Sequence, residues 1–236
     1  MLFDKYIAWI PARGGSKRLP KKNSLIFCGK PLIFYSIDVA KRCPSIDKVY
    51  VSTDDSNIAD LARQYGAEVI MRPEALSSDT ASTGSAAQHL LATLGITSSK
   101  QLKGLITLQP TQPLRTVSLL ESCIEKFENA NASALLTVGR NRHKLGRIEN
   151  GAFITITYKP EQRSQDMEPL YFEDGVVYIT KPELILEKGM VFDESAVPFV
   201  IPDVYSRIDI DDKLDFDIAE FIFMHEKELV NEFSPR

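Results

Sequence analysis

The chain has 236 residues, of which 44% are hydrophobic and 25% are charged, and its formal net charge is −4. A chain of this length and composition can bury a full core without disulfide or metal support, so we expect a single domain over residues 1–236. The negative net charge argues against a general nucleic-acid binder, because surfaces that track phosphates usually make a domain basic.

The first 140 residues alternate between short apolar runs and stretches with helical spacing. Strands are predicted at residues 6–10 and in "KVYVST", "AEVIMR", "GLITLQP" and "ASALLTV". Helices are predicted at residues 32–42, 58–65, 84–94 and 117–127. This alternation is typical of an α/β fold with a mostly parallel sheet and helices on both faces.

The pattern changes between about residues 139 and 171, which are polar and contain an Asn150-Gly151 pair typical of a hairpin turn. We expect this segment to form an inserted arm or subdomain. The α/β pattern then resumes with a strand in "GVVYIT", an edge strand in "AVPFVIP" and a closing helix over residues 214–230. One apolar face of that helix carries Leu214, Ile218, Phe221 and Ile222.

The stretch "IPARGGSKRLPKKN" follows the first predicted strand and places three lysines and two arginines between residues 13 and 22. It has neither the spacing G-x-x-x-x-G-K-[ST] nor the spacing G-x-G-x-x-G of the standard phosphate loops. The small residues at 14–16 can still bring backbone N–H groups close to an anion. Arg13, Lys17 and Lys22 beside them can neutralise several phosphate charges, which suits a triphosphate. The alternative is a solvated basic turn.

The segment "RIDIDD" places Asp209 and Asp211 two residues apart on one face of an extended chain. Their carboxylates can converge on one hard cation, and Mg²⁺ with bound phosphate is the expected occupant. The alternative is that the aspartates only cap the helix predicted to begin near Lys213, whose positive end favours them.

Two more polar turns follow predicted strands. The prolines of "QPTQPLR" fix a turn that presents Gln109 at the strand end, or they simply make a rigid loop. "RPEALSSDTAST" offers Arg72 and a hydroxyl-rich turn, in which Ser82 or Thr83 either reads a base edge or caps the next helix. The basic loop, "STDD", "QPTQPLR" and "IDIDD" all follow strand candidates, so these four clusters should share one rim of the sheet.

Other chemistries and locations have less support. The histidines are isolated, and the chain has no G-x-S-x-G or H-E-x-x-H motif, so neither a hydrolase triad nor a zinc site is expected. Three cysteines without C-x-x-C spacing fit free thiols in a reducing compartment. The N-terminal apolar run is too short for a signal peptide or a membrane span, so we expect a cytoplasmic protein without membrane association.

The motifs, in their order along the chain, resemble those of the acylneuraminate cytidylyltransferase family, the CMP-sialic acid synthetases. The resemblance spans about residues 6–220 and rests on "IPARGGSKRLPKKN", "VSTDD", "RPEALSSDTAS", "LQPTQPLR", "RSQD", "DGVVYIT" and "IDIDDKLDFDIAE". It implies a Rossmann-like nucleotidyltransferase fold and a reaction of CTP with a nine-carbon 2-keto acid, a nonulosonic acid, to give the CMP-sugar and pyrophosphate. It also implies Mg²⁺ as cofactor and a homodimer, in which the arm at 139–171 is the dimerisation segment that reaches toward the neighbouring subunit's site.

The resemblance implies roles for individual residues. Arg13, Lys22 and Asp211 would be catalytic, and Asp209 and Asp211 would bind the metal. The nucleotide site would comprise Arg13, Gly14, Gly15, Ser16, Lys22, Asn23, Arg72, Ser82 and Thr83. Of these, Arg13 and Lys22 would contact the triphosphate, and Asn23, Arg72 and Thr83 would hold the cytidine. The sugar acid would contact Gln109, Arg163, Gln165 and Tyr178.

Two departures from the family pattern concern the sugar. Sialic acid enzymes often have Arg-Arg-Gln-Asp and Arg-x-Asn-Gly, where this chain has "RSQD" at 163–166 and "FEDG" at 172–175. "RSQDMEPLY" and "FCGKPLI" are closer to the pseudaminic acid branch, so the sugar is expected among the bacterial relatives of sialic acid. The alternatives are a nucleotidyltransferase for another sugar, such as 3-deoxy-manno-octulosonate or a GTP-dependent one, and a nucleotide-binding module without catalysis.

Overall fold

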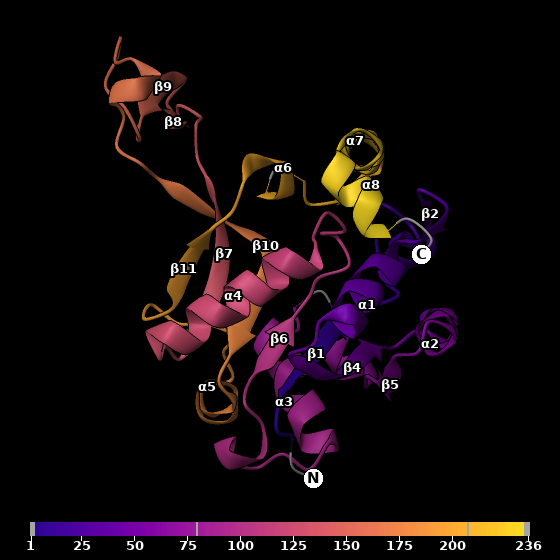
Figure 1. Ribbon diagram of the computed structural model, residues 1–236. Helices are drawn as coiled ribbons and strands as arrows, with labels where there is room; N and C mark the ends of the chain where they lie inside the picture. Colours follow the sequence, from indigo (N-terminus) through magenta and orange to yellow (C-terminus); the bar gives the residue numbers. More distant parts are fainter. Residues whose placement is uncertain (1–2, 79, 207, 234–236) are drawn as a thin grey trace.

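Figure 1 shows the computed structural model of the chain, which describes residues 3–78, 80–206 and 208–233. Over these ranges, a seven-stranded central sheet has the order β11-β7-β10-β6-β1-β4-β5. Its strands are β1 (Tyr6–Pro11), β4 (Ile46–Thr53), β5 (Glu68–Met71), β6 (Leu105–Thr107), β7 (Ala134–Arg140), β10 (Tyr171–Thr180) and β11 (Val197–Val200). Strand β10 is antiparallel to β6 and β7, and the other neighbouring pairs of this sheet are parallel. The predicted mostly parallel sheet is confirmed.

Strand β1 alternates its side chains between two hydrophobic cores. Tyr6, Ala8 and Ile10 belong to one core, and Ile7 and Trp9 belong to the other. Successive residues of a strand point to opposite faces of the sheet, so each core lies on one face. A strand that is apolar on both faces is typical of a sheet covered by helices on both sides.

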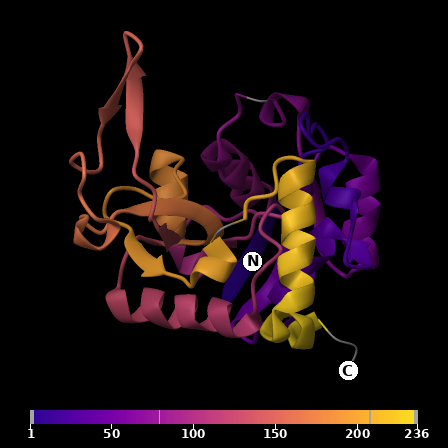
Figure 2. The same ribbon diagram turned by 90° about the horizontal axis from the view of Figure 1, so that it is seen from above.

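Helices do cover both faces, as Figure 2 shows from above. On one side lie α1 (Leu32–Arg42) and α4 (Val117–Ala130), whose buried side chains join the larger core. On the other side lie α3 (Thr83–Thr93) and α5 (Pro182–Lys188), which contribute to the core around Trp9. In the described part of the chain, no helix is both long enough and apolar enough to cross a bilayer.

The shorter elements lie at the edges of this sandwich. The helix α2 (Ser56–Gln64) begins at Asp55, whose carboxylate accepts a hydrogen bond from the Ile58 N–H and caps it. The strands β2 (Ile26–Phe27) and β3 (Lys30–Pro31) pair with each other. The helix α6 (Asp203–Ser206) precedes residues 208–212, called the aspartate segment below.

The predicted arm projects away from the body of the molecule (Figures 1 and 2). It carries a hairpin of β8 (Gly146–Glu149) and β9 (Ala152–Thr155). Asn150 and Gly151 join the strands with φ angles of 50° and 81°, the conformation of a type I′ turn that this pair favours. The large apolar side chains exposed on and after the hairpin include Ile148, Phe153 and Ile156.

The C-terminal part differs from the prediction. Two helices, α7 (Lys213–His225) and α8 (Lys227–Phe233), replace the single predicted closing helix. Of the predicted apolar face of α7, Leu214, Ile218 and Phe221 are exposed, whereas Ile222 is partly buried and packs against the core. The buried side chains of α7 are Phe216, Ala219 and Phe223. Apolar residues occur on every side of this helix, so the spacing alone could not select the buried face.

Candidate active site

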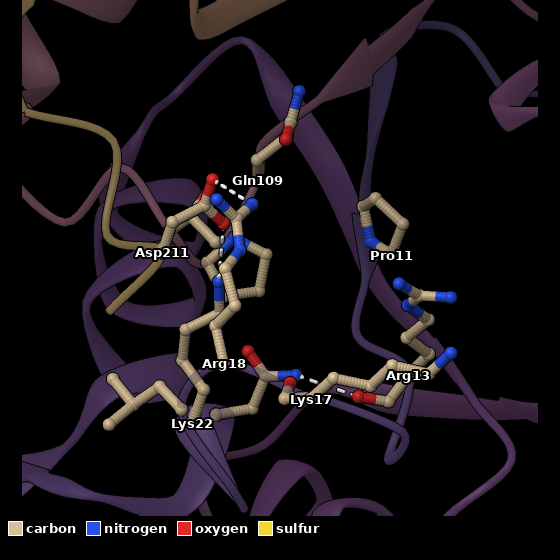
Figure 3. A pocket seen from close by; sticks show the side chains of 12 residues that line it. Pro11, Arg13, Lys17, Arg18, Lys22, Gln109 and Asp211 are labelled. Atoms are coloured by element: carbon tan, nitrogen blue, oxygen red, sulfur yellow. Dashed lines mark hydrogen bonds and ion pairs between the residues drawn. The ribbon is translucent and has the colours of Figure 1, made fainter. Parts of the chain in front are cut away.

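The polar clusters predicted from the sequence meet at one rim of the sheet. The basic loop (residues 12–22) follows β1, and it faces the aspartate segment across a cavity of 440 Å³ (Figure 3). The predicted site residues that line this cavity are Arg13, Ser16, Lys22, Asn23, Gln109 and Asp211. Three of the four clusters therefore share the cavity, and "STDD" contacts the basic loop from beside it.

Lys22 joins the basic loop to the aspartate segment. Its side chain is 11% exposed, and its Nζ donates to the Ile210 carbonyl at 2.5 Å and to Asp211 Oδ1 at 3.2 Å. The Nη2 of Arg18 donates to the other carboxylate oxygen of Asp211, Oδ2, at 2.5 Å. Each oxygen of this carboxylate thus has a cationic partner from the basic loop, and Figure 3 shows both side chains pointing at it.

Further contacts fix the glycine turn of the basic loop. The Gly14 N–H donates to Asp54 Oδ1 at 2.8 Å, and the Asn23 Nδ2 donates to the Arg13 carbonyl at 3.1 Å. A Cβ on Gly14 would lie 2.8 Å from the Cβ of Asp55, so a side chain does not fit there. The Gly14 N–H was expected to approach a phosphate. In the structure it donates to Asp54 instead and helps to hold the loop in place.

Gly15 has a different environment from Gly14. A Cβ built on Gly15 meets nothing within 4 Å, so this residue borders open space. The Ser16 N–H donates to the Gly14 carbonyl at 2.9 Å, and this bond closes the turn. A hydrogen bond within the turn therefore fixes its conformation, and the side at Gly15 stays accessible to a ligand.

The aspartates predicted to bind metal are not the cap of the following helix. Asp212 caps α7, because its carboxylate accepts from the Leu214 and Asp215 N–H groups. The alternative that Asp209 and Asp211 cap this helix is therefore wrong. Within the described ranges, no group of three or more His, Cys, Asp or Glu side chains is arranged to hold a metal ion.

Asp209 is exposed, and Asp211, two residues further on, is half-buried. Desolvation of the Asp209 carboxyl still raises its pKa above the usual value, and the negative charge of Asp211 acts in the same direction. The Lys22 ammonium opposes this shift. The two carboxylates are thus close enough to influence each other and share one nearby cationic side chain.

A second cavity, of 270 Å³, adjoins the first one. Arg13 and Gln109 line both cavities. The predicted base-reading residues Arg72, Ser82 and Thr83 line only the second. Arg72 and Thr83, expected at the cytidine, therefore lie apart from Lys22, expected at the triphosphate. Asn23, also expected at the cytidine, lines the first cavity instead. Arg13 and Gln109 lie between the two cavities.

Arg72 and Ser82 also have structural partners. The Nη2 of Arg72 donates to the Ser52 carbonyl at 3.0 Å, and burial lowers the pKa of its guanidinium. The Oγ of Ser82 accepts from the Ser85 N–H at 3.0 Å and caps α3. The cap predicted at Ser82 or Thr83 is confirmed at Ser82, which also lines the second cavity.

Arg115 supports the site from below and was not singled out from the sequence. It has no exposed surface, and burial lowers its pKa to about 9. Its guanidinium donates to the carbonyls of Gln109, Gln112 and Val176 and to the Ser36 hydroxyl. The position of this arginine directly after "QPTQPL" could have predicted its role, because a charged side chain beside a buried strand usually has its own hydrogen-bond partners.

The predicted sugar-binding residues do not come together in one chain. Gln109 lines the cavities, whereas Arg163 and Gln165 lie on the arm and line neither of these two cavities. Arg163 instead pairs with Asp166 at 2.8 Å. Tyr178 lies in β10, where its hydroxyl donates to Glu173 Oε1 at 2.5 Å and its ring is buried.

Comparison with known proteins agrees with this arrangement. The chain matches the family model described as Cytidylyltransferase over residues 7–221. It is 33% identical to the pseudaminic acid cytidylyltransferase of Campylobacter jejuni, over 93% of this chain and 96% of that one. It is 31% identical to the CMP-N,N'-diacetyllegionaminic acid synthase of Legionella pneumophila, over 92% of this chain and 95% of that one.

Two further matches are weaker, one in the share of the other protein that it covers and one in sequence identity. The N-acylneuraminate cytidylyltransferase of Escherichia coli is 30% identical over 91% of this chain, but the match spans only 51% of that protein. Among solved structures, a CMP:2-keto-3-deoxy-manno-octonic acid synthetase complexed with CTP superposes with a TM-score of 0.70, over 94% of this chain and 99% of that one. Its sequence identity of 16% supports the shared fold alone. The match over residues 7–221 and the relative that is 33% identical show that the chain belongs to the cytidylyltransferase family.

Proposed function

We propose that the protein transfers the cytidylyl group of CTP to a nonulosonic acid, giving the CMP-sugar and pyrophosphate. The observation that carries this proposal is the convergence of Arg13, Lys22 and Asp211 on one cavity in a member of the cytidylyltransferase family. Relatives named for pseudaminic and legionaminic acid match more than nine tenths of the chain, which supports a sugar of that class.

The reaction needs two substrates held in line. The anomeric hydroxyl oxygen of the sugar bonds to the α-phosphorus of CTP, the bond from that phosphorus to the pyrophosphate oxygen breaks, and the hydroxyl proton is released. Arg13, Ser16 and Lys22 line the cavity that would take the phosphates, and the two cationic side chains would stabilise the charge on the leaving pyrophosphate. No covalent intermediate is required, so these residues act by positioning and charge.

The second cavity suits the nucleoside. Arg72, Ser82 and Thr83 would face the cytosine and ribose there. Arg13 and Gln109 line both cavities, so the α-phosphorus would sit at the junction, with the Gln109 side chain turned toward the sugar acid. The backbone of Gln109 is held by the buried Arg115, which favours a fixed position for this side chain.

Asp209 and Asp211 fit a magnesium site in their donor chemistry. Both offer carboxylate oxygens and neither caps α7. Magnesium in nucleotide sites commonly takes one or two carboxylates and completes its shell with phosphates and water. When bound there, Mg²⁺ would neutralise charge on the phosphates.

The arm supports a homodimer as part of the proposal. Arg163 and Gln165 lie on the arm, outside the two cavities of their own chain. Ile148 and Phe153 of the hairpin are exposed at 79% and 58%, which is unusual for large apolar side chains. An arm that crosses to a second copy would bury these side chains and carry Arg163 and Gln165 to the other subunit's sugar site.

The proposal extends to the compartment, and two alternatives to the proposed reaction have less support. We place the reaction in the cytoplasm because Cys28, Cys43 and Cys123 are free thiols. A 3-deoxy-manno-octulosonate substrate is supported only by a shared fold, whereas the named relatives of about 30% identity act on nonulosonic acids by their names. A module without catalysis would leave the Asp209 and Asp211 pair without a role, so it is less favoured.

A pyrophosphate-release screen tests the proposal. The purified protein is assayed with CTP, GTP, UTP and ATP, each against pseudaminic, legionaminic, N-acetylneuraminic and 3-deoxy-manno-octulosonic acids. We expect release with CTP and a nonulosonic acid, and a CMP-sugar of the expected mass. The Asp211→Asn variant, purified in parallel, controls for a contaminating enzyme. Release with GTP alone, with 3-deoxy-manno-octulosonate alone, or with no pair would reject the proposed reaction.

A further inference from the structure

We propose that Arg18 is a further phosphate-binding residue, which Asp211 holds before the substrates bind and which passes to the triphosphate when a divalent cation takes its place. The inference rests on the proposed function, because it needs a nucleoside triphosphate and a cation in this cavity. The Nη2 of Arg18 lies 2.5 Å from Asp211 Oδ2. Arg18 lines the same cavity as Arg13 and Lys22, and Figure 3 shows its guanidinium directed at the carboxylate.

Asp211 has two cationic partners, and they are held very differently. The Lys22 side chain is 11% exposed, and its Nζ is also bonded to the Ile210 carbonyl, so it is fixed from two sides. The Arg18 side chain is 70% exposed, and the ion pair shown for it is the one with Asp211. Exposed ion pairs of this kind are weak and exchange readily with solvent ions. Arg18 is therefore the partner that can leave.

A divalent cation and the Arg18 guanidinium compete for Asp211. Both on one carboxylate would place like charges side by side, which is unfavourable. Once released, the guanidinium remains tethered at the edge of the cavity, close to where the phosphates would lie. Its planar pair of N–H donors matches two phosphate oxygens, which a lysine at this position could not do in the same way.

The exchange couples the two ligands. Phosphates that take up Arg18 leave Oδ2 of Asp211 free for a cation, and a cation on this oxygen leaves Arg18 free for phosphates. By thermodynamic linkage, each ligand then tightens the other by the same factor. If Arg18 only formed a solvated surface ion pair, its removal would leave this coupling unchanged.

The test measures binding rather than turnover. Binding of Mn²⁺ is followed by the EPR signal of the free ion, alone and with α,β-methylene-CTP, a CTP analogue that cannot react. Arg18→Gln is compared with Lys21→Gln, which removes the same unit of charge from the same loop. Lys21 is exposed, and the ion pairs of Asp211 shown in the described part of the chain involve Arg18 and Lys22 instead. Melting temperatures verify that both variants fold.

We expect Arg18→Gln to bind Mn²⁺ more tightly and the CTP analogue more weakly than the wild type. In Arg18→Gln, Mn²⁺ alone binds about two- to fivefold more tightly because its competitor is gone. The analogue binds about tenfold more weakly, and the factor by which it tightens Mn²⁺ binding falls. Lys21→Gln leaves the Mn²⁺ affinity without analogue unchanged.

Other results overturn the inference. Equal Mn²⁺ affinity in the wild type and Arg18→Gln would show that the two cations do not compete, and an equal gain in Lys21→Gln would show a general charge effect. If the wild-type protein does not bind the analogue, the proposed function fails together with this inference. If the wild type binds it and Arg18→Gln keeps the full coupling, only the role of Arg18 is wrong.

Discussion

The guanidinium of Arg115 donates a hydrogen bond to the backbone carbonyl of Gln109, although Arg115 has no exposed surface. The same side chain reaches the Val176 carbonyl at 3.0 Å. One buried residue therefore ties the loop after β6 to the neighbouring strand β10. The position of Gln109 at the junction of the two cavities depends on this contact.

Replacing Arg115 by lysine is expected to lower the free energy of unfolding by about 3 kcal/mol, because buried carbonyls lose their donors while a buried charge remains. Urea denaturation measures the change. Arg63→Lys, on an exposed ion pair of α2, is the matched control and should change stability by less than about 0.5 kcal/mol. Equal stability of Arg115→Lys and wild type would contradict the supporting role.

The aspartates at 211 and 212 should give opposite phenotypes. Asp211→Asn is expected to keep the melting temperature and abolish most pyrophosphate release, since a ligand for the cation is lost. Asp212→Ala is expected to lose about 1 kcal/mol of stability, because α7 loses its cap, and to retain most activity. Melting curves beside turnover at several Mg²⁺ concentrations distinguish the two. Wild-type turnover in Asp211→Asn, with an unshifted Mg²⁺ dependence, would remove Asp211 from the metal site.

Arg13 and Lys22 both belong to the basic loop, but they differ in burial, because Arg13 is half-buried and Lys22 is buried. Its side chain is mostly buried and holds the Ile210 carbonyl. Arg13→Ala should raise the KM for CTP about tenfold or more while leaving the melting temperature unchanged. Lys22→Ala should weaken CTP use to a similar degree and also destabilise the fold by about 1–3 kcal/mol. Unchanged CTP kinetics in both variants would reject the phosphate loop.

Mixed subunits can show whether the arm acts on the second copy. Arg163→Ala and Asp211→Asn should each be nearly inactive alone. If Arg163 serves the partner's site, a refolded equal mixture should recover about a quarter of wild-type activity, because half of the dimers are mixed and one of their two sites is intact. No recovery would place Arg163 at the site of its own chain or outside any site. Sedimentation of the Ile148→Asp variant as a monomer would support the arm as the contact.

The three thiols should react slowly in the folded protein. Burial raises the pKa of Cys28 to about 11 and that of Cys43 and Cys123 to about 12. At pH 8 the thiolate of Cys28 is then about a hundredfold scarcer than in an unperturbed thiol, and raising the pH toward 11 should restore reactivity. Iodoacetamide labelling with and without guanidinium chloride measures this. Rapid labelling of native protein at pH 8 would contradict these shifts.

The elements that position the basic loop and Gln109 could be predicted from the sequence, because apolar spacing and turn residues define each of them locally. The helix at 32–42 has the predicted bounds, since apolar spacing and a short flanking turn define it without reference to the rest of the fold. The basic loop and Gln109 follow buried strands, and parallel strands end at one edge, so their meeting in one cavity follows from the pattern.

The remaining features depend on contacts between distant segments. Strand periodicity is the same in either direction, so it could not show that β10 runs antiparallel to its neighbours. The ion pairs of Lys22 and Arg18 with Asp211 could not be predicted from the basic loop, because Asp211 lies far along the chain. The buried face of α7 depends on which neighbouring element covers the helix, and the residues of α7 alone do not identify that neighbour.

The direction of β10 has a consequence for how this family can change. Arg140 at the end of β7 pairs with Tyr171 at the start of β10, so the chain leaves the sheet and returns to it at adjacent points. We therefore expect that an insert whose two ends lie side by side can replace residues 141–170 while β7 and β10 keep their pairing. Because the proposed sugar contacts Arg163 and Gln165 lie in this segment, we expect an exchange of residues 141–170 between relatives to change the acceptor preference and to leave the proposed CTP site unaltered.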